Sequence, residues 1–401
     1  MATIIRQSYI DKIERYLGKE TIIVLVGQRR VGKSCMMKMI RDRKKADDCN
    51  NIIFIDKEKR EFDNIQTYQD LNDYIGQHFL SDKHNYILID EIQDIRAFER
   101  SIRSYRTEPN TDIIITGSNA RMLSNELSTL IGGRYKEIYI QSLSYNEFLE
   151  FHQLSDNDEA LALYIQYGGL PGLAKIGLEE DDAREYQMDI YHTVLLKDVI
   201  MRNQIRNVPF LENLVRFLAD NTGKLISANS IAKYMKSQGE SITSTAIINY
   251  ISFLCEAYIL HKVNRYDIHG KRIFETNDKF YFEDNGIRNA IAGGTREGDI
   301  EKMIENIIYQ NLIRLGYQVY VGQLQAGEID FVCTKPGGER IYVQAYYIIA
   351  DDATREREFG NLRAIKDNYP KYVISMTPLL TKNDDDGITH LHLRKFLTEG
   401  I

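Results

Sequence analysis

Short runs rich in apolar and β-branched side chains alternate with longer amphipathic stretches through the first 141 residues. The runs predict strands of a buried sheet, and they occupy residues 21–26, 51–56, 86–90, 112–116 and 136–140. The stretches between them predict helices at residues 35–44, 65–80, 92–106 and 120–130. Because strand and helix alternate, we expect an α/β fold in which helices cover both faces of a parallel sheet.

The loop after the first predicted strand has the sequence GQRRVGKS at residues 27–34. It fits the phosphate-binding pattern G-x-x-x-x-G-K-[ST] and stands between a strand and a helix, as that pattern requires. The glycines let backbone N–H groups face phosphate oxygens, Lys33 brings positive charge to the β- and γ-phosphates, and Ser34 offers a hydroxyl to magnesium. The residues expected to bind the nucleotide are Gly27, Gln28, Arg29, Arg30, Val31, Gly32, Lys33, Ser34 and Cys35.

Two adjacent acids, Asp90 and Glu91, end the third predicted strand. In a parallel sheet this end lies at the same edge as the phosphate loop. We expect Asp90 to hold magnesium together with Ser34, and Glu91 to orient and deprotonate the attacking water. The pair alone would also suit a solvated strand end, but beside a phosphate loop it favours a hydrolase over a passive nucleotide binder.

Two further segments contain candidate catalytic side chains. Ser118 and Asn119 follow the fourth predicted strand and could position the water beside the γ-phosphate, although these residue types also serve plain turns and helix caps. Arg134 could reach the γ-phosphate in a neighbouring subunit as an arginine finger, or it could form a surface salt bridge. The sequence leaves both pairs of alternatives open.

The middle of the chain has two patterns. Residues 142–205 are mostly helical, with a break at GGLPG (168–172) that suits a hinge or a simple connector. Residues 209–290 have three helical stretches followed by two strands, the order of a winged helix-turn-helix. Residues 209–265 contain six Lys or Arg and four Asp or Glu, and the third helix contains no Lys or Arg. DNA reading and a protein-contact or structural role both stay open.

The composition is that of an ordinary globular protein, with 43% hydrophobic and 27% charged residues and a net charge of −7. The absence of long apolar runs and of a secretory leader pattern predicts no membrane partner and a cytoplasmic location. The four cysteines form no C-x-x-C pair, which argues against a disulfide scaffold or a cysteine zinc site. Since the chain is acidic, any DNA contact must come from a local basic patch.

Several segments, taken in order, resemble prokaryotic AAA+ ATPases that carry a C-terminal domain of unknown function with a nuclease-like fold. The segments are GQRRVGKS (27–34), ILIDEIQ (87–93), ITGSNARMLS (115–124), GGR (132–134), LSYNEFLEF (143–151), YGGLPG (167–172) and LLKDVI (195–200). The resemblance covers nearly the whole chain. It implies an AAA+ P-loop ATPase core at 1–141, a helical lid at 142–205, a winged helix-turn-helix at 206–292 and a nuclease-like domain at 293–401. It favours ATP over GTP and implies no established substrate.

The C-terminal segment, residues 297–401, has the order helix, strand, strand, strand, helix, strand, which resembles a restriction-endonuclease-like fold. This resemblance implies a metal site made by a Glu on the first helix, an Asp on the second strand and E-x-K on the third. Glu305 and Asp330 match the first two, but Gln344 and Tyr346 replace the glutamate and the lysine. A neutral amide cannot supply the second carboxylate that a hard cation requires. We therefore expect a nuclease-like scaffold without nuclease activity.

Together these features predict an ATPase that hydrolyses Mg-ATP to drive conformational change of its C-terminal domains, with ATP and Mg²⁺ as cofactors. The alternative is a nucleotide-gated DNA-binding or regulatory module with little turnover, for which ATP is a conformational ligand. Glu91 favours the ATPase, because a pure switch needs no general base. The other expected partners are a protein or a second copy of the chain, and DNA only through a local patch.

Overall fold

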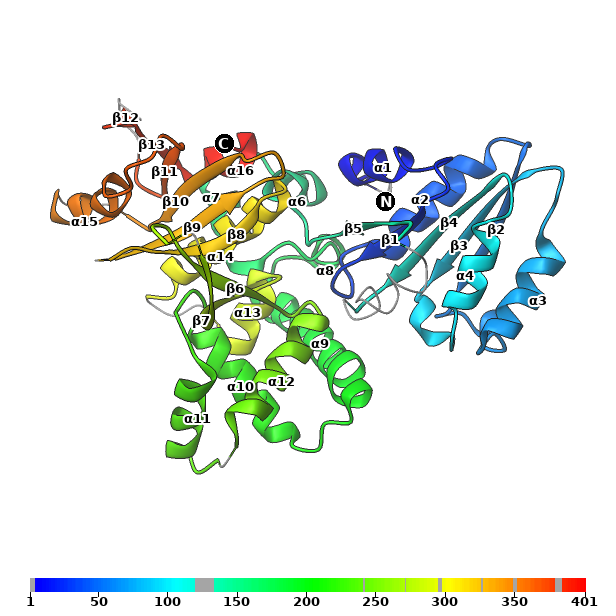
Figure 1. The fold of residues 1–401 in the computed structure, drawn as a ribbon, viewed down its shortest axis with the longest axis horizontal. Helices are drawn as coiled ribbons and strands as arrows, with labels where there is room; N and C mark the ends of the chain where they lie inside the picture. The colour runs from blue at the N-terminus through cyan, green and yellow to red at the C-terminus, as the bar shows by residue number, and fades with distance from the viewer. Residues whose placement is uncertain are drawn as a thin grey trace. The chain divides into compact units, whose positions relative to one another are not determined.

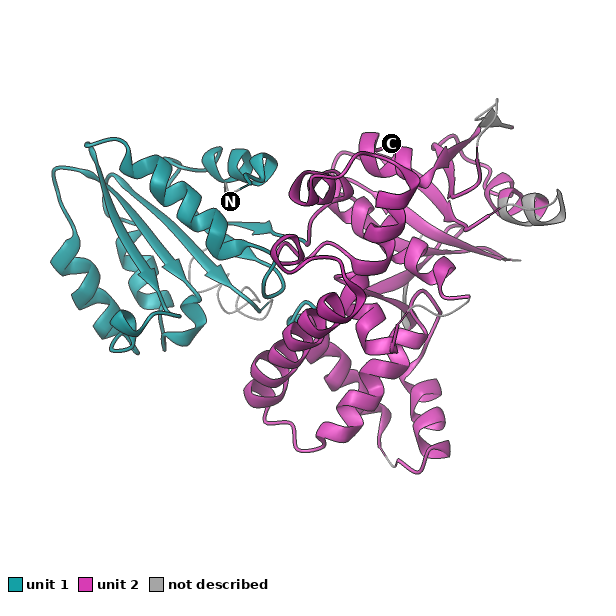
Figure 2. Cartoon of the chain, turned by 180° about the vertical axis from the view of Figure 1, so that it is seen from behind, with its two compact units in different colours: residues 1–141, 256–258 teal, residues 142–255, 259–401 magenta. Residues whose placement is uncertain are grey.

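The computed structural model describes residues 4–119, 133–240, 242–270, 272–294, 298–325, 327–348, 352–378 and 384–401. The chain forms two compact units, coloured separately in Figure 2. Unit 1 comprises residues 1–141 with 256–258, and unit 2 comprises residues 142–255 with 259–401. The predicted helix at 120–130 lies outside the described residues.

Unit 1 contains a five-stranded parallel sheet in the order β2-β3-β4-β1-β5. Its strands are β1 (Ile22–Val26), β2 (Asn50–Asp56), β3 (His84–Asp90), β4 (Thr111–Gly117) and β5 (Tyr135–Tyr139). Every side chain of β1 is buried, as the continuous apolar run predicts for a strand covered on both faces. The predicted parallel α/β sheet is therefore confirmed.

Helices cover both faces of this sheet (Figure 1). The helices α1 (Gln7–Glu14) and α2 (Lys33–Lys45) pack one hydrophobic cluster, while α3 (Tyr68–His78) and α4 (Glu99–Tyr105) pack the other. The helix predicted at 92–106 is instead a 3₁₀ turn (Ile92–Asp94) followed by α4. The reason is local, because Ala97, inside the predicted range, has a positive φ angle that interrupts an α-helix.

Unit 2 contains an eight-stranded mixed sheet in the order β12-β13-β11-β10-β9-β8-β6-β7. The strands are β6 (Leu260–Asp267), β7 (Arg272–Phe282), β8 (Gln318–Gln323), β9 (Glu328–Thr334), β10 (Arg340–Ala345), β11 (Lys371–Ser375), β12 (Asp384–Asp385) and β13 (Ile388–His392). Because β6 pairs with β8, a single sheet contains strands from both sides of residue 292, where the sequence places a domain limit. The domain limits given above stay predictions.

The helices of unit 2 precede its strands or pack against them. They are α6 (Tyr145–His152), α7 (Asp158–Tyr167), α8 (Leu173–Ile176), α9 (Glu180–Val194), α10 (Val208–Asp220), α11 (Ala228–Ser237), α12 (Ser244–Glu256), α13 (Asn285–Ala292), α14 (Ile300–Arg314), α15 (Asp352–Arg363) and α16 (Leu393–Glu399). A π-helical stretch, Leu195–Met201, continues α9. The main hydrophobic core joins α6, α7, α14 and α16 to one face of the sheet.

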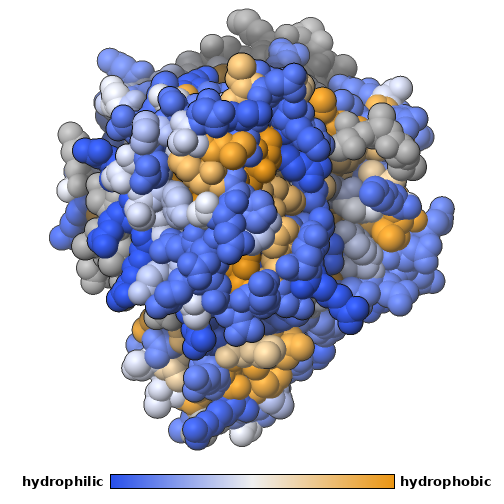
Figure 3. All heavy atoms as spheres, turned by 90° about the vertical axis from the view of Figure 1, so that its right-hand side faces the viewer, coloured by the Kyte–Doolittle hydropathy of each residue, from blue (hydrophilic) through white to orange (hydrophobic). Residues whose placement is uncertain are grey.

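The surface is largely hydrophilic with separate apolar patches, as the face in Figure 3 shows. Large exposed apolar side chains include Leu196, Met201 and Ile248. Among the described helices, none combines the length and the apolar character that crossing a bilayer would require.

Candidate active site

The phosphate loop leaves the carboxyl end of β1 and enters α2. Gly27 has a φ angle of +140°, and a Cβ placed on it would lie 2.1 Å from the carbonyl oxygen of Ile140. Gly32, with a φ angle of +104°, is the N-cap residue directly before α2. Only glycine suits the first position, because both the backbone angle and the contact with Ile140 exclude a side chain. The loop conformation therefore depends on residue 140 as well as on its own sequence.

Lys33 lies inside this loop. Its Nζ donates to the carbonyl oxygens of Gly27 and Gln28, both at 2.8 Å, and its side chain is buried. The ammonium group is thus held at the start of α2, where the helix N-terminus also favours an anion. Phosphate binding by Lys33 stays a prediction, and this arrangement suits it.

Asp90 ends β3 with its carboxylate buried beside the loop. Thr116 donates its hydroxyl hydrogen to Asp90 Oδ1 at 2.5 Å, while Oδ2 has no hydrogen bond among the described residues. Burial raises the pKa of Asp90, and the neighbouring hydroxyls of Thr116 and Ser34 act against that rise. A buried oxygen that lacks a donor, next to a serine hydroxyl, suits an oxygen-seeking divalent cation. The predicted pair of Ser34 and Asp90 therefore fits magnesium.

Glu91 follows Asp90 in a left-handed conformation, with a φ angle of +55°. Its N–H donates to Thr116 Oγ1 at 2.9 Å, and its carboxylate accepts a hydrogen bond from the amide of Gln93. The guanidinium of Arg29, from the phosphate loop, lies 4.0 Å from the same carboxylate. Thr116 thus fixes both acids, and Glu91 faces the loop from the adjacent part of the sheet edge.

The remaining predicted catalytic residues lie at opposite edges of the sheet. Ser118 and Asn119 are buried directly after β4, at the carboxyl edge that also contains Asp90. Arg134 precedes β5 and is exposed, and its carbonyl oxygen accepts a hydrogen bond from Ile22 at the start of β1. The structure therefore does not bring Arg134 to the phosphate loop of its own unit. Action on a neighbouring subunit stays a prediction.

Three residues near the acids were not among the sequence candidates: Asp56, Gln93 and Thr116. Asp56 ends β2 in register with Asp90, and its buried carboxylate lies 3.4 Å from the ammonium of Lys38. A parallel sheet aligns the ends of neighbouring strands. Since Asp56 ends the second predicted strand, the sequence could have indicated that it lies near Asp90. Thr116 and Gln93 act through hydrogen bonds that no residue spacing reveals.

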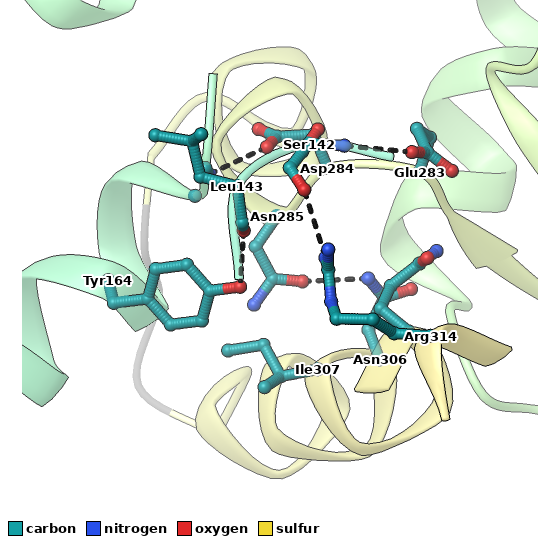
Figure 4. Close-up of a pocket in the computed structure, with 12 residues that line it drawn as sticks. Ser142, Leu143, Tyr164, Glu283, Asp284, Asn285, Asn306, Ile307 and Arg314 are labelled. Atoms are coloured by element: carbon teal, nitrogen blue, oxygen red, sulfur yellow. Dashed lines mark hydrogen bonds between the residues drawn. The ribbon is translucent and has the colours of Figure 1, made fainter. Parts of the chain in front are cut away.

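A small polar hollow in unit 2 surrounds the first residues of that unit (Figure 4). Glu283 accepts a hydrogen bond from Ser142 N–H at 3.2 Å, and Arg314 donates to Ser142 O at 2.9 Å. Leu143 N–H donates to the carbonyl oxygen of Gly169 at 2.7 Å. A Cβ on Gly169 would lie 2.4 Å from the carbonyl oxygen of Leu143, so the YGGLPG segment allows this close approach. These hydrogen bonds hold Ser142 and Leu143, the first residues of unit 2, in place.

Asp284 lies in the same hollow and accepts hydrogen bonds from Gly169 N–H at 2.8 Å and Ile287 N–H at 3.1 Å. Burial raises its pKa from 3.8 to about 6 in spite of these bonds. The folded protein therefore binds a proton more tightly than the unfolded chain does, and stability falls as pH rises through this range. The total loss is about 3 kcal/mol, of which roughly 1 kcal/mol falls between pH 5 and pH 7.

We expect Asp284→Asn to flatten this pH dependence, because the amide resembles the protonated acid. Urea unfolding at pH 5 and pH 7, followed by circular dichroism, measures the difference between variant and wild type. Asp299→Asn is the control: burial acts to raise the pKa of Asp299, but ion pairs with Lys302 and Arg288 lower it overall from 3.8, so this carboxyl titrates below pH 5 and its removal should leave the difference between pH 5 and pH 7 unchanged. An unchanged slope in Asp284→Asn would contradict the assignment.

The predicted nuclease-like residues also come together in unit 2. Glu305 on α14 and Asp330 on β9 both accept hydrogen bonds from Lys279, which lies on β7. Gln344 on β10 accepts a hydrogen bond from Asp330 N–H at 3.3 Å. Across the described residues, no group of three or more His, Cys, Asp or Glu side chains is arranged to hold a metal ion. No sequence pattern indicated that a lysine from a distant strand would join these acids.

Two family models match separate regions of this chain, and related proteins match most of its length. Residues 19–149 match the AAA domain family, and residues 158–298 match a domain of unknown function (DUF8612). An uncharacterized protein of Haemophilus influenzae is 32% identical over 406 residues, covering 99% of each chain. An uncharacterized protein of Methanocaldococcus jannaschii is 26% identical and covers 88% of this chain and 81% of its own.

Among solved structures, a Walker-type ATPase of Pyrococcus abyssi has a similar fold, with a TM-score of 0.52 and 15% identity over 72% of this chain and 96% of its own. The domain of unknown function found here occupies residues 158–298, whereas the resemblance implied one at the C-terminus. The nuclease-like fold of residues 293–401 stays a prediction.

Proposed function

This chain belongs to the same protein family as the Haemophilus influenzae protein, and from its AAA domain we propose that it binds Mg-ATP and hydrolyses it. One observation carries the proposal: the phosphate loop, the neighbouring Ser34 and Asp90, and Glu91 all lie at the carboxyl edge of one sheet. A passive binder requires the loop, but it does not require a second acid that faces the loop.

The proposed roles follow from the contacts. Lys33 would exchange its two loop carbonyl acceptors for phosphate oxygens. Ser34 and Asp90 would hold magnesium, which supplies positive charge that offsets the phosphate charge. Glu91 would accept the proton of the attacking water, and Thr116 keeps its backbone in the required conformation. Ser118 and Asn119 would position that water.

We further propose that nucleotide turnover moves unit 2 through the short segment at residues 140–142. In unit 1, Ile140 contacts Gly27 and donates its N–H to Val26 O at 2.8 Å. Two residues later, Ser142 is held within unit 2 by Glu283 and Arg314. A change in the phosphate loop would therefore displace residue 140, which is two residues before Ser142 in the chain.

Phosphate release from Mg-ATP by the purified chain tests the ATPase proposal, with and without duplex DNA. We expect steady turnover. Stimulation by DNA would assign a reading role to residues 206–292, and its absence would favour a protein contact for that segment. If ATP binds without turnover in either condition, the nucleotide-gated regulatory module replaces the ATPase as the proposed function.

We also propose that residues 293–401 form a nuclease-like scaffold without nuclease activity. Gln344 stands where a second carboxylate is required, and its amide oxygen is bonded to Asp330 N–H. Supercoiled plasmid incubated with the protein and Mg²⁺ or Mn²⁺ is expected to stay intact. Cleavage that disappears in Asp330→Ala would overturn this proposal.

A further inference from the structure

Lys279 is a buried cation at the meeting point of three carboxylates. Its Nζ lies 2.6 Å from Glu328 Oε1, 2.9 Å from Glu305 Oε1 and 3.0 Å from Asp330 Oδ1. The side chain is only 3% exposed. One oxygen from each acid therefore converges on a single buried point, and an ammonium group occupies it.

The alternation of side chains along β7 explains how the lysine reaches this point. Lys279 and Tyr281 are two residues apart, so they share one face of the strand. Both contact Glu305, since the Tyr281 hydroxyl donates to Glu305 Oε1 at 2.6 Å. The acids themselves come from α14 and β9. The lysine thus joins the β6–β7 hairpin to elements that are distant in sequence.

The charges of the cluster hold the ammonium in its protonated form. Burial alone would lower the pKa of Lys279, but Glu305, Asp330 and Glu328 raise it well above its usual range. Burial raises the pKa of Glu305 to about 7. Asp330 is fixed from its other side, because its Oδ2 accepts a hydrogen bond from Ala345 N–H at 3.0 Å. The cluster remains acidic even with the lysine in place.

We propose that the Lys279 ammonium takes the place of a metal cation in this cluster. It keeps divalent cations from binding to the three carboxylates, and it links β7 to α14 and β9. The cluster is therefore a metal-independent internal link. As the three acids stand they form no metal site, and only removal of the lysine would let them close on a divalent ion. This inference does not depend on the nucleotide site.

The wild-type protein offers a test that requires no mutation. Reductive methylation of the folded chain, followed by peptide mass spectrometry, compares Lys279 with Lys262, whose side chain is 42% exposed and pairs with Asp278. We expect Lys279 to react at least about tenfold more slowly, because the chain must open locally before it can react. Equal rates would overturn the proposal.

Substitution of the lysine tests the position of the cation. In Lys279→Met the three acids lose their counter-ion, and we expect Mn²⁺ to raise the melting temperature by about 3 °C or more. Wild type and the matched control Lys262→Met should lack this added rise, because any Mn²⁺ bound at Ser34 and Asp90 affects all three proteins alike. Adding Asp330→Asn to Lys279→Met should abolish the effect, since one of the converging oxygens is then neutral.

If Lys279→Met does not fold, Lys279→Gln, which leaves all three carboxylates in place and supplies a hydrogen-bond donor, is tested in the same way. A folded variant that gains no response to Mn²⁺ would overturn the proposed cation position. If wild type bound Mn²⁺ and Asp330→Asn did not, the proposal that Lys279 excludes divalent cations from the cluster would be overturned. If neither variant folds, the methylation rates decide.

Discussion

Replacing Glu91 by glutamine is expected to lower kcat for ATP hydrolysis by about 10²–10⁴-fold and to leave ATP binding nearly intact. The amide has the size of the carboxylate but cannot take a proton from water. The groups that would bind the nucleotide, Lys33 and the pair of Ser34 and Asp90, are unchanged in this variant. Steady-state phosphate release and an equilibrium nucleotide titration measure the two effects separately.

Glu108→Gln is the matched control, because Glu108 is exposed in the turn before β4, at the opposite edge of the sheet from the phosphate loop. We expect this variant to turn over as wild type does. Equal turnover in Glu91→Gln and wild type would remove Glu91 as the general base. A loss of ATP binding in Glu91→Gln would instead give the residue a structural role.

The phosphate loop and the two acids were predictable because each depends on a short segment. The phosphate-binding pattern lies within the consecutive residues Gly27 to Ser34. Asp90 and Glu91 end an apolar strand, and the alternation of strands and helices predicts that this strand belongs to a parallel sheet. The parallel sheet is confirmed, and the functional roles of these residues stay predictions.

The contacts that fix the site were not predictable, because they join segments far apart in the chain. Thr116 bonds to Asp90 and Glu91 across neighbouring strands. Arg134 is different, because the strand predicted at 136–140 already places it before a parallel strand, at the amino edge of the sheet. Hydrogen bonds of this kind depend on register, which the sequence pattern does not determine.

The same limit applies to unit 2. Three helices, α10 to α12, are followed by two strands, β6 and β7, in the order that the sequence predicts, and β7 continues to Phe282, so that it includes Lys279. The pairing of β6 with β8 was not foreseen, and it is this pairing that brings Lys279 to Glu305 and Asp330. A boundary drawn from sequence at residue 292 hides that connection.

Replacing Gly27 by alanine is expected to abolish nucleotide binding and to lower the free energy of unfolding by about 3 kcal/mol or more. The φ angle of +140° is unfavourable for alanine, and the new Cβ would lie 2.1 Å from Ile140 O, which belongs to backbone and cannot rotate away. Relief of the clash must move either the loop or residue 140. Either movement displaces the carbonyl oxygens that hold Lys33.

Gly18→Ala separates the clash from the general strain of a positive φ. Gly18 has a φ angle of +72° and no heavy atom within 4 Å of the added Cβ, so we expect a cost of about 1 kcal/mol and normal nucleotide binding. Nucleotide titration and urea unfolding of both variants make the comparison. If Gly27→Ala behaved like Gly18→Ala, the contact with Ile140 would not hold the loop, and coupling through residues 140–142 would lose its support in unit 1.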